Sequence, residues 1–354
     1  MPSLPDVELY EIVNIFALLI GLLYGLIAQK TQFCFSGAIK DYVLEKSTRR
    51  ASSLLLAMIT AIVSSQLLSE IYTIDFTQSI YLQENVNYYT IVFGGVLFGS
   101  GMMLADGCSS RHLVKFAQGS LNSLVTVLFI AIFAYITSKG LLSYGFRLLQ
   151  ESELLLSLSS IIPNKPVSMF LILAVLLLAL WKLIPNLKNL ILCSDGFFVG
   201  LLIGASWFVT GVLGFDDFEA LPLEGLSFVF ASGKTLEYLM FFSGSTLSFS
   251  VSVIFGILLG AFIMSMFNNK YRFGCASAKK NDTLKNAMIG GSLMGVGGIL
   301  SLGCTVGQGL TGLSTLAFAS VLAITSIALS AYVTAEYMKK KDTLPSCFAF
   351  DWKI

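Results

Sequence analysis

The residues with the clearest chemistry in this sequence are two cysteines, Cys108 and Cys304, because each ends a copy of the same apolar stretch. The first copy, GGVLFGSGMMLADGC, begins at Gly94, and the second, GGSLMGVGGILSLGC, begins at Gly290. An offset of 196 residues aligns the copies without a gap and pairs most of their glycines. Close helix packing accounts for the early glycines, but it does not account for the shared Gly-Cys ending.

Both Gly-Cys pairs are followed by small polar residues and another helix-forming run, which predicts a discontinuous or re-entrant element. Gly107 and Gly303 mark where the first helices stop, and Ser109 and Thr305 stand where the next helices begin. The N-terminus of a helix carries unpaired N–H groups and partial positive charge, so it is suited to bind anions. The alternative is a satisfied helix cap without a ligand; two copies favour the anion site.

The thiol adds a property that a simple anion site does not need. It is a weak donor and a polarizable acceptor, and it suits a soft, sulfur-bearing anion. At a helix N-terminus a thiol also becomes more acidic and more nucleophilic. Two hypotheses follow: neutral thiols pass the anion along by weak hydrogen bonds, or a thiolate forms a transient persulfide. Because a thiolate repels an anion, the neutral relay is preferred.

Lys115, Gly307 and Gln308 are further candidates for contact with the anion. Lys115, seven residues after Cys108, is either a ligand or a solvated charge, and Gln308 either binds a sulfonate oxygen or completes the start of its helix. His112 has no visible partner and is expected at the surface or interface. With a single histidine and no CxxC pair, the sequence predicts no metal site and no cofactor.

The elements that carry these residues are expected to be membrane helices. The chain has 354 residues, of which 55% are hydrophobic and 12% charged, and several windows are nearly free of charge over the length that crosses a bilayer. A net charge of +1 without a dense basic patch excludes a nucleic-acid partner. The first apolar segment lacks the flanks of a signal peptide and is expected to be a resident helix.

Nine spans are predicted, at about 10–28, 51–72, 89–106, 120–138, 167–184, 191–213, 247–267, 284–303 and 315–335.

The distribution of basic residues predicts the orientation of the single membrane domain, residues 1–354. With the N-terminus outside and the C-terminus inside, 18 of the 22 Lys and Arg residues lie on the inner side. The two Gly-Cys copies are then antiparallel, which indicates an inverted pseudo-two-fold repeat with halves at about 1–140 and 185–338. Residues 339–354 form a cytoplasmic tail.

Three motifs give the chain a specific resemblance. They are QFCFSGAIKD around Cys34, ADGCSSRHLVKFAQG around Cys108, and LGCTVGQGLTGLS around Cys304. In these motifs and their spacing, the chain resembles the YeeE/YedE family of sulfur-compound transporters over nearly its whole length. Arg111-His112 departs from the family pattern, which often has glycine there, and it brings a positive charge close to Cys108.

The resemblance implies an hourglass-shaped α-helical permease of the inner membrane, embedded in the lipid bilayer, that imports thiosulfate or a related sulfur anion. It also implies that Cys34, Cys108 and Cys304 contact the ion in succession and that a small TusA-like sulfur carrier is the cytoplasmic partner. The protein is expected not to be an enzyme. The alternatives are a permease for a selenium or other sulfur species, and a membrane sulfurtransferase with Cys108 or Cys304 as nucleophile. The remaining cysteines, Cys193, Cys275 and Cys347, are expected to lie outside the path.

Overall fold

The computed structural model describes residues 9–82, 87–145, 165–183, 193–215, 221–242, 244, 246–271, 273 and 282–344. The predicted tail beyond residue 344, with Cys347, and the loop that holds Cys275 lie outside these ranges. The described helices are α1 (Leu9–Thr31), α2 (Phe35–Glu45), α3 (Arg49–Tyr72), η1 (Phe76–Gln78), α4 (Tyr88–Leu104), α5 (Ser109–Ala117), α6 (Leu121–Ser138), α8 (Lys165–Leu183), α10 (Ser194–Phe208), η3 (Val209–Leu213), α11 (Val229–Met240), α12 (Phe249–Phe267), α13 (Asp282–Leu300), η4 (Gly307–Gly312) and α14 (Phe318–Lys340).

Seven helical stretches of the described chain are long and apolar enough to cross a membrane, which confirms a multi-pass α-helical membrane protein. Two of them, Leu9–Glu45 and Tyr88–Ala117, each contain a long helix and the short helix that follows it. Two predicted spans are not among the seven: α13, and α8, of which only Ile172–Lys182 counts as a shorter apolar helix. Nine spans and the N-out, C-in orientation therefore stay predictions.

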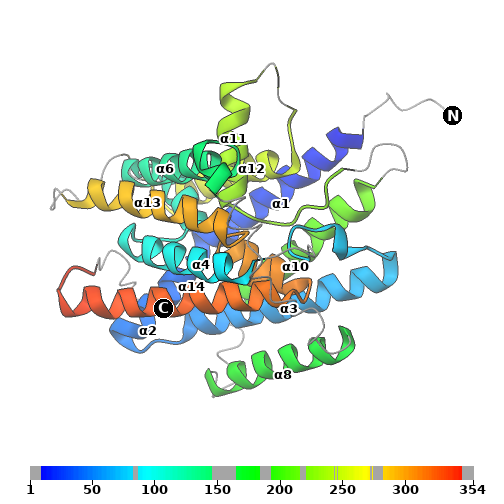
Figure 1. Cartoon of the computed structure of the whole chain (residues 1–354), viewed down its shortest axis with the longest axis horizontal. Helices are drawn as coiled ribbons and strands as arrows, with labels where there is room; N and C mark the ends of the chain where they lie inside the picture. Colours follow the sequence, from blue (N-terminus) through cyan, green and yellow to red (C-terminus); the bar gives the residue numbers. More distant parts are fainter. Residues whose placement is uncertain are drawn as a thin grey trace.

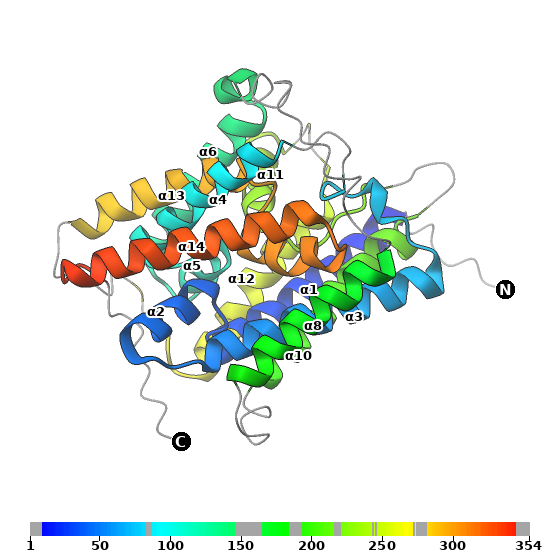
Figure 2. The same cartoon turned by 60° about the horizontal axis from the view of Figure 1, so that its bottom comes forward.

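The long helices form two rows of four. Contacts connect α12, α1, α10 and α3 in one row and α14, α4, α13 and α6 in the other, while α8 packs against α3. Figure 1 shows α6, α13, α4 and α14 one below the other, with α8 at the periphery, and in Figure 2 this row lies beside the row that contains α1 and α3. The short helices α2, α5, α11 and η4 contact members of both rows and so fill the space between them.

The two glycine-rich copies, now α4 and α13, pack directly against each other and run antiparallel. A Cβ on Gly94 would lie 2.8 Å from the carbonyl oxygen of Gly297, and a Cβ on Gly101 would lie 2.8 Å from that of Gly290. Because the residue numbers rise in one helix as they fall in the other, the crossing is antiparallel. The backbones touch only because neither helix has a side chain there, so the early glycines serve packing as expected.

The start of α4 is fixed by its own sequence. Asn87 precedes the helix, and its side-chain oxygen accepts hydrogen bonds from the backbone N–H groups of Tyr89, at 3.0 Å, and Thr90, at 3.4 Å. A cap of this kind contributes about 1 kcal/mol to the stability of a helix. The glycine-rich helix, which has weak intrinsic propensity, is thus held by a cap at one end and by packing along its length.

Candidate functional site

All three cysteines of the predicted path stand at the same kind of chain reversal. The residue two positions before each cysteine is left-handed: Gln32 has a φ of 60°, Asp106 of 66° and Leu302 of 57°. Such a residue closes the C-terminus of one helix. Cys34 and Cys108 then have extended backbones and precede the first residues of α2 and α5.

The hydrogen bonds of the two Gly-Cys reversals repeat at the offset of 196 residues that relates the sequences. Gly107 N donates to Met102 O at 3.0 Å, and Gly303 N donates to Gly298 O at 2.7 Å, which are the six-residue bonds of the Schellman motif. One turn later, the N–H of His112 donates to Cys108 O, and that of Gln308 donates to Cys304 O. Each thiol-bearing residue is therefore the first acceptor of a new helical segment, as the sequence predicts.

The thiols of Cys34 and Cys108 are neighbours. Their Sγ atoms are 3.7 Å apart, and both side chains are buried. Each sulfur also lies within hydrogen-bond distance of the serine two residues later, at 3.0 Å for Ser36 and 3.3 Å for Ser110. Two helix N-termini, two thiols and two hydroxyls thus converge at one buried point.

Cys304 lies between α13 and η4, and its sulfur accepts a hydrogen bond from the N–H of Gly307 at 3.3 Å. A Cβ on Gly307 would lie 2.8 Å from Ser227 Oγ. Gln308 is fully buried, and its Nε2 donates to Ser301 O at 2.6 Å. This bond ties the new helical segment to the end of the preceding one, and Gln308 thus completes the reversal.

Polar atoms without partners gather around these thiols. Buried polar groups are normally hydrogen-bonded, so an orphaned group calls for an explanation. In the part of the chain that the structure describes, the buried side-chain atoms near the thiols that lack a hydrogen-bond partner include Ser109 Oγ, Thr305 Oγ1, Gln308 Oε1 and both ring nitrogens of His112. Ser109 and Thr305 therefore do not cap their helices with their side chains, and their hydroxyls remain available to a ligand.

Tyr24, in the middle of α1, is a site residue that the sequence analysis missed. It is fully buried, it lies within electrostatic range of all three thiols, and its ring packs against Phe228 with the centroids 5.2 Å apart. Tyr81 is the counterpart beside Cys304, and burial raises the pKa of its phenol above the usual value. The signal for Tyr24 is a lone hydroxyl inside an apolar span, which many membrane helices share.

Lys115 does not stand free beside Cys108. Its Nζ donates to Asp106 Oδ2 at 3.0 Å and to the carbonyl oxygen of Asp106 at 2.7 Å. Lys40 of α2 bonds the other carboxylate oxygen of Asp106. Lys40 is therefore a buried structural partner of Asp106. The alternative of a solvated Lys115 is wrong, because α5 lies between the rows and only 12% of the Lys115 side chain is exposed.

His112 is also buried, with 2% of its surface exposed, so the expected surface or interface position is wrong. It packs on the reversal, since a Cβ on Gly107 would lie 3.1 Å from His112 Nε2. A Cβ on Gly303 would lie 3.2 Å from Gln308 Cγ in the other copy.

Arg111 is buried too, bonds Gln32 and lies within electrostatic range of Cys34.

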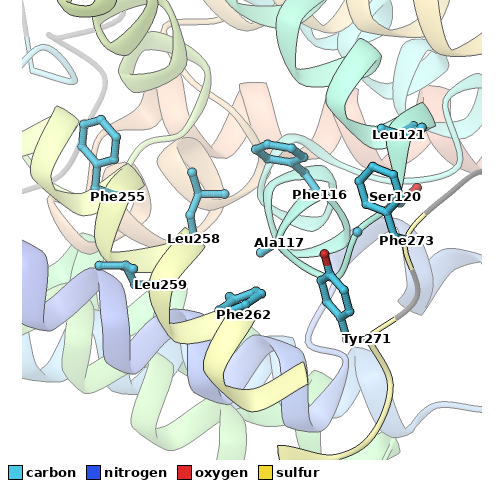
Figure 3. A pocket seen from close by; sticks show the side chains of 11 residues that line it. Phe116, Ala117, Ser120, Leu121, Phe255, Leu258, Leu259, Phe262, Tyr271 and Phe273 are labelled. Carbon is cyan, nitrogen blue, oxygen red and sulfur yellow. The ribbon is translucent and has the colours of Figure 1, made fainter. Parts of the chain in front are cut away.

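The other features of the described chain lie apart from this site. Cys193 precedes α10, where burial and then Asp195 raise the pKa of its thiol, as befits a packing cysteine. Among the described residues no three His, Cys, Asp or Glu side chains form a group that could hold a metal ion. An apolar cavity of about 340 Å³ between α5, α6 and α12, drawn in Figure 3, contains none of the thiols in its lining.

The buried thiols and polar groups lie at helix N-termini inside a multi-pass helical protein. This arrangement is typical of a membrane transporter. The chain belongs to the family described as "Sulphur transport", whose pattern matches residues 30–333. This finding confirms the resemblance to the YeeE/YedE family and the placement in a membrane.

Two relatives extend along most of the chain. The thiosulfate transporter TsuA of Escherichia coli K12 is 27% identical over 83% of this chain and 85% of its own length. The thiosulfate transporter TsuA of Spirochaeta thermophila is 26% identical over 86% of this chain and 93% of its own length. The probable transporter YedE of Escherichia coli K12 is 26% identical over only 30% of this chain.

Proposed function

We propose that the protein imports thiosulfate or a closely related sulfur anion along a path formed by the thiols of Cys304, Cys108 and Cys34. The observation that carries the proposal is the placement of each thiol at the start of a helical segment, with the unpartnered oxygens of Ser109, Thr305 and Gln308 beside Cys108 and Cys304. The two full-length relatives named as thiosulfate transporters support the substrate class.

A buried path for an anion needs groups that replace water, because moving an ion out of water costs several kcal/mol even after the protein relaxes. Helix N-termini supply part of this compensation through their free N–H groups. Hydroxyl groups such as those of Ser109, Thr305 and Tyr24 donate hydrogen bonds to oxygen. The thiols supply weak, polarizable contacts that suit the terminal sulfur of the anion.

An inverted repeat accounts for the order of contacts that we propose. The packing comes in matched pairs: α1 with α12 corresponds to α10 with α3, and α4 with α14 corresponds to α13 with α6. This pattern, together with the antiparallel α4 and α13, supports two halves of opposite orientation. With the N-terminus outside, Cys304 faces the outer half, and Cys108 and Cys34 face the inner half. The ion then passes from Cys304 to the Cys34–Cys108 pair.

The cytoplasmic partner proposed for the released anion is a small TusA-like sulfur carrier, which remains a prediction. We propose transport of the intact ion rather than transfer of its outer sulfur. The thiols lie beside hydroxyls and a second thiol, and hydrogen bonding to these groups suits reversible contact along a path.

Uptake of labelled thiosulfate into right-side-out membrane vesicles tests this function. The label is placed on the outer sulfur in one batch and on the sulfonate sulfur in another, and vesicles without the protein serve as the control. Equal accumulation of both labels is expected. Accumulation of the outer-sulfur label alone would indicate a sulfurtransferase, and stronger competition by a selenium compound or sulfite than by thiosulfate would indicate a different substrate.

A further inference from the structure

The Asp106 carboxylate forms ion pairs with two lysines that belong to two different short helices. Lys40 of α2 bonds Oδ1, and Lys115 of α5 bonds Oδ2 at 3.0 Å. The side chains are largely buried, with 7% of Lys40, 12% of Lys115 and 17% of Asp106 exposed. An ion pair with so little solvent screening is costly to break, because removal of one partner leaves a buried charge uncompensated.

The helices joined in this way are the two that begin at the contacting thiols. Lys40 stands six residues after Cys34, and Lys115 seven residues after Cys108. Asp106 itself stands two residues before Cys108, at the end of the reversal. One carboxylate therefore connects α2, α5 and the turn between α4 and α5.

The second copy of the reversal indicates that the carboxylate is not needed for the turn. Leu302 occupies the position of Asp106, with a φ of 57° against 66°, and the hydrogen bonds of the turn are the same. An aliphatic residue thus makes this backbone equally well. Cys304, which follows Leu302, has no second thiol at a short distance among the described contacts, whereas Cys108 has one. The acidic side chain occurs in the copy where two thiols must be held together.

We infer that Asp106 is a positioning residue, which binds Lys40 and Lys115 together and thereby holds the thiols of Cys34 and Cys108 in contact. It acts through the lysines and does not touch the anion. The importance of this contact for transport rests on the proposed function, but the geometric claim does not.

Cross-linking of the two thiols measures their proximity directly. The full chain, with Cys193, Cys275 and Cys347 replaced by serine, is treated with diamide. Diamide accepts two electrons and two protons as the two thiols form one disulfide, and intact-mass measurement with peptide mapping follows the bond. The variants are Asp106→Asn and the conservative Asp106→Glu. Glu237→Gln is the matched control, because Glu237 pairs with Lys139 at 2.8 Å far from the thiols in sequence and at an exposed site.

Asp106→Asn is expected to slow formation of the Cys34–Cys108 disulfide by about tenfold or more, because small displacements of reacting groups have large effects on rate. The maximal rate of uptake falls with it, while KM changes by less than about twofold, since the outer half is untouched. Asp106→Glu restores part of both rates, and Glu237→Gln leaves both unchanged.

Cross-linking of Asp106→Asn at the native rate would overturn the proposal, as would a change in KM alone. If Asp106→Asn does not insert or fold, Lys40→Met and Lys115→Met take its place. Slower formation of the Cys34–Cys108 disulfide in either lysine variant supports the positioning role of Asp106. The native rate in both lysine variants refutes it. A native protein that takes up no thiosulfate would refute the proposed function, and the cross-linking rates would still decide the role of Asp106.

Discussion

The sulfur of Cys34 lies 3.7 Å from the sulfur of Cys108, although the two residues are 74 positions apart in the chain. This contact brings the N-termini of α2 and α5 together at one buried point. A sulfur anion there meets two thiols and two sets of free N–H groups at once. In the proposed path, this pair receives the ion from Cys304 and releases it towards the inner side.

Replacement of Tyr24 by phenylalanine tests whether its hydroxyl faces the path. The hydroxyl lies near Ser110 and within electrostatic range of all three thiols. A single interaction of this kind contributes about 1 kcal/mol, so its removal should lower the thermal stability only slightly. A lost hydrogen bond to the ion should raise KM for uptake by about 2- to 10-fold. Tyr332→Phe, on the exposed side of α14, is the control. A KM equal to that of the native protein would remove Tyr24 from the path.

Replacement of Gln308 by glutamate places a negative charge beside Cys304 with little change in shape. Like charges in a poorly solvated site repel strongly, and uptake should fall by about 100-fold or more. Gln118→Glu is the matched control, because Gln118 bonds the carbonyl oxygen of Lys270 away from the thiols. Equal losses in both variants would show that the charge acts on folding and not on the ion.

Replacement of Gly297 by alanine tests the crossing of α4 and α13. The added Cβ would lie 2.6 Å from the backbone of Gly94 and Phe98, and overpacking of this kind costs about 1–3 kcal/mol. Thermal unfolding in detergent, followed by size-exclusion chromatography, should show a lower midpoint. Gly145→Ala, where nothing lies within 4 Å, should unfold like the native protein. Equal midpoints for the two variants would contradict the close crossing.

The orientation is tested by labelling of single introduced cysteines at the two ends of α3. Gln78→Cys is expected to react with a membrane-impermeant maleimide in intact cells, because residues 73–88 are predicted outside. Lys46→Cys should react only after the membrane is opened. Both positions are exposed. The reverse pattern would place the N-terminus inside and would invert the proposed direction of the path.

Much of this architecture follows from local sequence. The apolar runs predict the long helices to within a few residues, and the paired Gly-Cys endings predict the reversals before α5 and η4. The reversal before Cys34 is harder to predict, because Gln32 adopts the left-handed conformation without a glycine nearby. The last described helix differs from the span predicted at about 315–335: α14 begins at Phe318, because Leu316 is left-handed and Ala317 is extended, and it runs to Lys340.

The contacts that the sequence does not reveal join segments that lie far apart in the chain. Lys40 and Asp106 are 66 positions apart, and only the folding of α2 against the α4–α5 turn brings them together. Similarly, α11 lies between the spans predicted at about 191–213 and 247–267, and its 12 residues are too few to span a bilayer. Local patterns indicate where a helix stops, but they do not indicate what lies opposite its end.

The most direct test of the account is uptake of labelled thiosulfate by three alanine variants, Cys34→Ala, Cys108→Ala and Cys304→Ala, each inserted in the membrane at the native level. Cys193→Ala is the matched control, a buried cysteine outside the path. Loss of one hydrogen bond to a charged ligand costs about 1.5–3 kcal/mol. Uptake by each of the three variants should therefore fall by about 10- to 100-fold, while the control transports normally. Native rates in all three variants would contradict the path of thiols.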